Sequence, residues 1–182
     1  VFGDSITRIP NYFCQSFDKL KTVILPSNLE SIGSNAFHGC DSLSSSIVLD
    51  SVQTIGSQAF YNCYCIRDIK FGRNLKVIGS SAFENTGIRS AIFHEGLDSI
   101  ANSAFSSCDS LKVVSIPSSV RYIESRNVGS IAFAECNAID SIYWNAHNCH
   151  DVPFKSTNNA NVRVVVFGDS ITRIPNYFCQ SF

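Results

Sequence analysis

Apolar residues return along the chain at a nearly constant interval. An isoleucine marks each interval, at Ile9, Ile32, Ile55, Ile78, Ile100 and Ile123, with spacings of 23, 23, 23, 22 and 23 residues. The next isoleucine of the series, Ile174, lies 51 residues after Ile123, which is two periods of 23 plus five. A fixed period of roughly 20 to 50 residues is typical of a solenoid, in which each repeat forms one structural unit.

The remaining apolar positions keep a fixed distance from this isoleucine. An Ala-Phe pair starts four residues after it, and a cysteine follows eight residues after it in most units. Alternating apolar pairs come next, two residues apart, and this spacing predicts a short strand with one buried face. The pairs are Val23/Leu25, Ile47/Leu49, Ile69/Phe71, Ala91/Phe93, Val114/Ile116, Ile142/Trp144 and Val165/Phe167.

Each unit is therefore expected to contain one strand, a turn and a short irregular or 3₁₀ segment around the Ala-Phe pair. A single unit cannot bury its apolar side, but stacked units form a continuous core with neighbouring strands about 4.8 Å apart. The pattern predicts about seven to eight stacked units of 22–23 residues. A parallel β-sheet should cover one face, with turns and short 3₁₀ segments on the other.

Five surplus residues interrupt the pattern after Ile123. They fall at Glu124–Val128, because Gly129-Ser-Ile-Ala-Phe133 restores the repeat. We expect this insertion to form an exposed excursion from the turn, so that its deletion leaves the fold intact. Loops on a rigid scaffold often carry specificity, and this one is a place where specificity could reside.

A longer repeat is superimposed on the short one. Residues 1–17 recur without a change at 166–182, an offset of 165 residues. Two explanations remain open, an excerpt from a long tandem array and a chain that uses one cap sequence twice. We favour the array and expect residues 1–182 to form a single uncapped solenoid, since capping units normally have a polar outer face.

The order Ile-Gly-x-x-Ala-Phe-x-x-Cys-x-x-Leu, followed by a strand and Pro-Ser-x-(Leu/Val)-x-x-Ile, resembles the BspA-like (treponemal-type) leucine-rich repeats. Segments 31–43 and 100–123 are close matches, whereas segments 142–149 and 162–174 look like a variant unit without the Gly-x-x-Ala-Phe signature. The resemblance covers essentially the whole chain and implies a leucine-rich-repeat solenoid. It also implies an extracellular or cell-surface location and a role in adhesion or partner binding, and it transfers no catalytic residue and no cofactor.

Composition narrows the choice of partner. The formal net charge is −1, from 14 basic and 15 acidic residues. No block of like charges is present, so neither nucleic acid nor an anionic membrane is an expected partner. No apolar run approaches the roughly 18–20 residues that cross a bilayer, so membrane insertion is not expected.

One stretch resembles an enzyme motif. The run Val164-Val-Val-Phe-Gly-Asp-Ser170, repeated in part before Ser5, resembles the nucleophile block of GDSL-type hydrolases. Such a serine needs a histidine base and an acid, which that family supplies as Asp-x-x-His. The residues three before His38, His94, His147 and His150 are Asn35, Ala91, Trp144 and His147. We therefore interpret Gly168–Ile171 as a turn that ends a strand, and an esterase is a distant alternative.

Cysteine and histidine offer two further candidates. The segment His147-Asn-Cys-His150 with Asp151 carries ligand types suited to zinc, but no second ligand pair accompanies it, so an ordinary loop is favoured. Cys40, Cys63, Cys108 and Cys136 share one column and are expected to form a ladder of buried thiols rather than disulfides. Cys14 and Cys179 are one site in two copies of the long repeat, and Cys65 and Cys149 lie off the column.

The outward row of the strands is the candidate binding surface. It consists of Ile24, Val48, Lys70, Ile92, Ser115, Tyr143 and Val166. Five of these seven residues are apolar, and contiguous exposed apolar surface often marks an interaction site, although β-branched residues also suit exposed strands. The leading hypothesis is a non-enzymatic protein-binding or adhesion scaffold. The alternative is a structural subunit of a head-to-tail extracellular fibre, with self as partner, because open strand edges promote further pairing.

Overall fold

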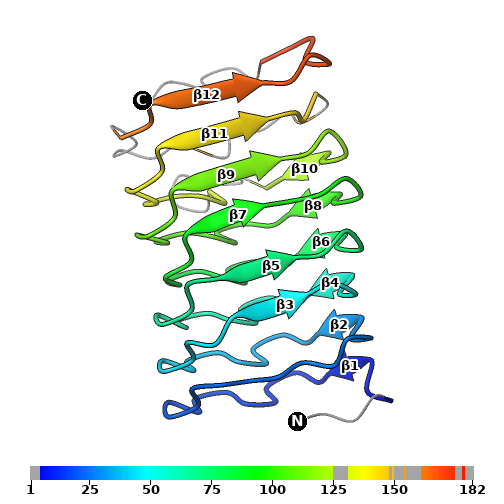
Figure 1. Cartoon of the computed structure of the whole chain (residues 1–182), viewed down its shortest axis with the longest axis vertical. Helices are drawn as coiled ribbons and strands as arrows, with labels where there is room; N and C mark the ends of the chain where they lie inside the picture. The colour runs from blue at the N-terminus through cyan, green and yellow to red at the C-terminus, as the bar shows by residue number, and fades with distance from the viewer. Residues whose placement is uncertain are drawn as a thin grey trace.

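The computed structural model describes residues 5–124, 131–147, 149, 154, 161–174 and 178. The chain winds upward in stacked turns from the N-terminal to the C-terminal end, and all strand pairs in this part are parallel (Figure 1). The solenoid predicted from the period is confirmed, with about six turns rather than seven to eight. Fewer turns result because Ile174 is 48% exposed and belongs to no strand.

The predicted strands lie along one side of the solenoid, which we call the long-strand face (Figure 1). It is built from β3 (Ile47–Leu49), β5 (Ile69–Phe71), β7 (Ser90–Ile92), β9 (Val113–Ile116), β11 (Ser141–Trp144) and β12 (Val164–Phe167). Hydrogen bonds join β3 to β5 and run from β7 through β9 and β11 to β12. The register pairs equivalent residues, as with Val114, Ile142 and Val165, so the count of residues per unit is correct.

The expected strand at Val23/Leu25 is not formed. Both side chains are only half-buried, and the backbone around them has no strand assignment. The amide of Val23 donates to the hydroxyl of Ser45 at 3.3 Å, so a side chain of the next unit replaces the backbone carbonyl that a parallel ladder requires.

A second sheet, which the sequence did not predict, forms the short-strand face. Its strands have two residues each: β1 (Arg8–Ile9), β2 (Ser31–Ile32), β4 (Thr54–Ile55), β6 (Val77–Ile78), β8 (Ser99–Ile100) and β10 (Tyr122–Ile123). In every one the column isoleucine is buried, while the residue before it is exposed or half-exposed. A two-residue strand contains a single alternation, which is too short for a periodic pattern to reveal.

The Ala-Phe segments form successive turns, and the described residues include no 3₁₀ helix. Within one unit the amides of Ala36 and His38 bond back to Gly33 and Asn35, as in ordinary turns. The alternate amides of Asn35 and Phe37 instead donate to the next unit, to the carbonyls of Ser57 and Ala59 at 2.9 and 2.8 Å. A left-handed residue such as Asn35 (φ 57°) gives the backbone this alternation, which a 3₁₀ helix with all its hydrogen bonds internal cannot provide.

Stacked phenyl rings run through the core. Consecutive rings of the series Phe37, Phe60, Phe83, Phe105, Phe133 and Phe154 lie 5.2–5.3 Å apart and within 25° of parallel. Phe154 belongs to the variant unit, where the sequence showed no phenylalanine of this column. The spacing hides it, because Phe154 follows Phe133 by 21 residues instead of 23. Of the insertion Glu124–Val128 only Glu124 lies within the described residues.

Candidate functional site

The outward row of the long-strand face is exposed along most of its length. The exposed fractions are 59% for Ile24, 48% for Val48, 49% for Ile92, 40% for Tyr143 and 43% for Val166. Lys70 is exposed and Ser115 is half-exposed. Register pairs Val48 with Lys70, Ile92 with Ser115, and Tyr143 with both Ser115 and Val166, so these side chains are neighbours across adjacent strands. The structure thus places the predicted residues on one continuous outer row.

Polar residues divide this row into apolar parts. The ammonium group of Lys70 lies 3.0 Å from a carboxylate oxygen of Asp50, with both side chains more than half exposed. An exposed pair of this kind contributes little to stability, so Lys70 can exchange Asp50 for a partner at small cost. The largest apolar part is at the C-terminal end, where Val164, 41% exposed, joins Tyr143 and Val166.

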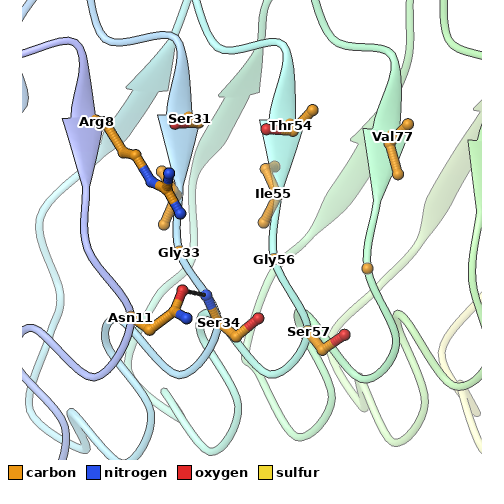
Figure 2. A pocket seen from close by; sticks show the side chains of 12 residues that line it. Arg8, Asn11, Ser31, Gly33, Ser34, Thr54, Ile55, Gly56, Ser57 and Val77 are labelled. Atoms are coloured by element: carbon orange, nitrogen blue, oxygen red, sulfur yellow. Dashed lines mark hydrogen bonds between the residues drawn. The ribbon is translucent and has the colours of Figure 1, made fainter.

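The short-strand face carries a shallow groove of about 480 Å³, which the sequence did not indicate. Figure 2 shows its two rims, one with Arg8, Ser31, Thr54 and Val77, and the other with Asn11, Ser34 and Ser57. The side-chain carbonyl of Asn11 accepts a hydrogen bond from the amide of Ser34 at 2.9 Å. Arg8 is the one charged residue among the groove's lining residues, so the groove presents mostly hydroxyl and backbone groups.

Glycines form the floor of this groove. Gly33, Gly56 and Gly79 follow the buried isoleucines of β2, β4 and β6. A Cβ on Gly56 would lie 2.5 Å from the amide nitrogen of Ser34, and one on Gly79 would lie 2.6 Å from that of Ser57. The glycines are therefore required by the close approach of successive backbones, and the groove results from tight stacking.

The cysteine column forms the buried ladder that its spacing predicted. Cys40, Cys63, Cys108 and Cys136 are all 0% exposed, and all are free thiols. Each thiol donates to a backbone carbonyl of the preceding unit, those of Cys14, Phe37, Phe83 and Phe105, at 2.9–3.2 Å. Thr86 occupies the same column between Cys63 and Cys108, and its hydroxyl donates to the carbonyl of Phe83 at 2.8 Å. The column thus satisfies backbone acceptors inside the core.

Burial also makes these thiols unreactive. Loss of hydration raises the pKa of Cys40 from 9.0 to about 11, and it raises the pKa values of Cys63 and Cys136 further. The thiolate is the nucleophile and the metal ligand, so thiols that remain protonated at neutral pH serve neither purpose. Cys65 differs from the column, because its side chain is exposed.

The two remaining candidates lie near the C-terminal end. Gly168–Ile171 forms a turn directly after β12, in which the amide of Ile171 donates to the carbonyl of Gly168 at 3.0 Å, as expected. Ser170 and Ser5 are exposed. In the zinc candidate, His147 is half-buried and Cys149 is buried, whereas His150 and Asp151 lie outside the described residues. Within the described part, no group of three or more His, Cys, Asp or Glu side chains is placed to hold a metal ion.

Comparison with known proteins agrees with this architecture. Residues 7–127 match the BspA type leucine rich repeat region in six copies. A leucine-rich-repeat protein of T. pallidum (TpLRR) has a similar fold, with a TM-score of 0.67 and 23% identity over 83% of this chain and 67% of that one. A leucine-rich cell surface protein from Faecalibacterium prausnitzii A2-165 shares 34% identity, with a TM-score of 0.58 over 65% of this chain.

The match spans 30% of the F. prausnitzii protein, so this chain corresponds to a part of that larger molecule. No curated protein matches the sequence. The described residues contain no helix that is long and apolar enough to cross a membrane. The repeat motif, its six copies over residues 7–127 and the stacked parallel strands together place the chain in the BspA-type leucine-rich-repeat family.

Proposed function

We propose that the chain is a non-enzymatic scaffold that binds a protein partner through the outward row of the long-strand face. The observation that carries the proposal is the exposure of Ile24, Val48, Ile92, Tyr143 and Val166 along one row. Exposed apolar side chains that are neighbours across a sheet form the kind of surface that protein partners cover.

The shape of the row favours a protein over a small ligand. Seven units at about 4.8 Å each extend the row to about 30 Å, which suits a protein interface. The groove lies on the other face, so the row itself is an open surface rather than a pocket. Tyr143 is a suitable anchor, because tyrosine is enriched among the residues that dominate binding energy.

A cell-surface location follows from the family and from the description of the F. prausnitzii relative as a cell surface protein. Adhesion to a host or neighbouring surface protein is the corresponding biological role. The structure of the core supports a non-enzymatic scaffold, since its thiols are buried hydrogen-bond donors.

Two matched double variants test the proposal. Ile24→Ser/Ile92→Ser removes apolar side chains from the long-strand face, and Val77→Ser/Tyr122→Ser removes comparably exposed ones from the short-strand face. The labelled chain is applied to a layer of cultured epithelial cells, with and without trypsin treatment of the cells. We expect trypsin-sensitive binding that falls about tenfold in the first variant and stays unchanged in the second. Equal binding by the two variants, or binding that survives trypsin, would overturn the proposal.

A further inference from the structure

One sequence occurs in two different surroundings in this chain. Residues 166–182 repeat residues 1–17, so Phe178 corresponds to Phe13. Phe13 is 43% exposed, whereas Phe178 is 3% exposed. Because the two segments are identical, the difference in burial comes from the unit against which each one packs.

The rings that bury Phe178 belong partly to the preceding unit. Its centroid lies 5.1 Å from that of Trp144 and 5.8 Å from that of Phe154, with interplanar angles of 72° and 71°. Both are edge-to-face arrangements, which aromatic pairs prefer. Trp144 and Phe154 are themselves 6.3 Å apart and almost fully buried. We call Trp144, Phe154 and strand β11 the acceptor surface.

Backbone contacts hold the repeated segment on the same surface. Val166 and Phe167 pair with Tyr143 and Trp144 of β11, and the amide of Gly168 donates to the carbonyl of Trp144 at 3.1 Å. A Cβ on Gly168 would collide with the side-chain oxygen of Asn145, so glycine is needed there. The acceptor surface therefore recognises Val-Phe-Gly and a phenylalanine ten residues later, and residues 1–17 supply the same features at Val1-Phe-Gly3 and Phe13.

We propose that the acceptor surface binds residues 1–17 of a second copy of the chain in the way that it holds residues 166–182. Copies then join head to tail, and such a heterologous contact does not close, so the product is an open chain of molecules. This self-association uses a different surface from the partner-binding row and provides the contact that a fibre requires. Within one molecule the segment 166–182 competes for the site at a high effective concentration, which limits exchange until that segment is weakened.

Variants of the full chain test the proposal. Phe178→Ala weakens the segment that occupies the acceptor surface but leaves Phe13 available in every molecule. We expect the weight-average mass of Phe178→Ala, measured by light scattering over a concentration series, to exceed that of the wild type by about twofold or more. The double variant Phe13→Ala/Phe178→Ala lacks both rings and should remain at the mass of the wild type.

Two results would overturn the proposal. One is a Phe178→Ala protein with no greater mass than the wild type, and the other is a double variant that associates as strongly as Phe178→Ala. A peptide control separates specific docking from unfolding of the variant. A peptide of residues 1–17 should block the association of Phe178→Ala at a concentration about tenfold lower than the same peptide with Phe13→Ala. Equal effects of the two peptides would also reject the proposal.

Discussion

The phenyl rings of Phe60 and Phe83 stack face to face, with centroids 5.3 Å apart and planes 7° from parallel. The two residues are 23 positions apart, so one repeat length separates two rings that touch. The same contact continues to Phe37 on one side and Phe105 on the other. The energy of any one unit therefore depends on both of its neighbours, as expected for a solenoid.

Removal of one ring from the stack should destabilise several units. We expect Phe60→Ala to lower the free energy of unfolding by about 3–5 kcal/mol, because Phe60 is fully buried and contacts rings on both sides. Ile55→Ala, in the same unit, should cost about 2–5 kcal/mol. Tyr64→Ala is the control, since Tyr64 is 49% exposed and should cost about 0.5 kcal/mol or less. Urea titration measures all three, and tolerance of both core changes would contradict the assigned columns.

A single methyl group at a groove glycine should also be costly. In Gly56→Ala the new Cβ would lie 2.5 Å from the amide nitrogen of Ser34, so adjacent units must separate. We expect a loss of about 1–3 kcal/mol, typical of overpacking. The neighbouring Ser57→Ala, at an exposed position, should change stability by about 0.5 kcal/mol or less. Equal melting temperatures for the two variants would show that the backbones are not so closely stacked.

The thiols should differ sharply in their access to reagents. In the native protein Cys40, Cys63, Cys108 and Cys136 should resist alkylation by iodoacetamide, whereas Cys65 should react within minutes, because only Cys65 of these five is exposed. Denaturation with urea should make all five reactive. Peptide mapping by mass spectrometry identifies the modified residues, and rapid native labelling of the column would refute the buried ladder.

Alkaline pH should destabilise the protein through the same column. The thiol of Cys40 has a pKa of 9.0 when unperturbed and about 11 in the fold, so between these values the unfolded chain loses a proton that the folded chain retains. The unfolded state then binds fewer protons, and the free energy of unfolding falls as pH rises above about 9. Below pH 9 the thiol is protonated in both states and this contribution to stability is complete. Urea midpoints from pH 7.5 to 10.5 should decline less in Cys40→Ala/Cys63→Ala than in the wild type, and parallel slopes would exclude a contribution from the thiols.

The sequence predicted those features that depend on long repetition. The isoleucine column, the phenylalanine stack and the cysteine ladder each recur over several units, and the structure places their members together in the core. The short-strand face was missed because strands such as β4, with Thr54 and Ile55, are too short to show a period. Phe154 was missed because the variant unit is two residues shorter in that interval. The groove of the short-strand face depends on backbone spacing at Gly33 and Gly56, and a column of glycines alone does not reveal which side of the chain is hollow.

The partner-binding row was predicted as a set of outward residues, and its exposure follows from strand alternation. Its division by the Lys70–Asp50 ion pair could not be predicted, because Asp50 is brought to Lys70 by the stacking of β3 on β5. The function of the row remains a prediction. It depends on the partner's surface as well as on this one.

Photo-crosslinking from single positions tests the central claim, that the long-strand face binds a protein partner. Benzoylphenylalanine is introduced at Ile92 on the long-strand face or at Val77 on the short-strand face, where the native side chains are 49% and 39% exposed. Each protein is bound to the epithelial cell layer, irradiated and recovered under denaturing conditions. The account predicts a discrete, trypsin-sensitive adduct from position 92 and none above background from position 77. Adducts of equal yield from both positions, or from position 77 alone, would contradict it.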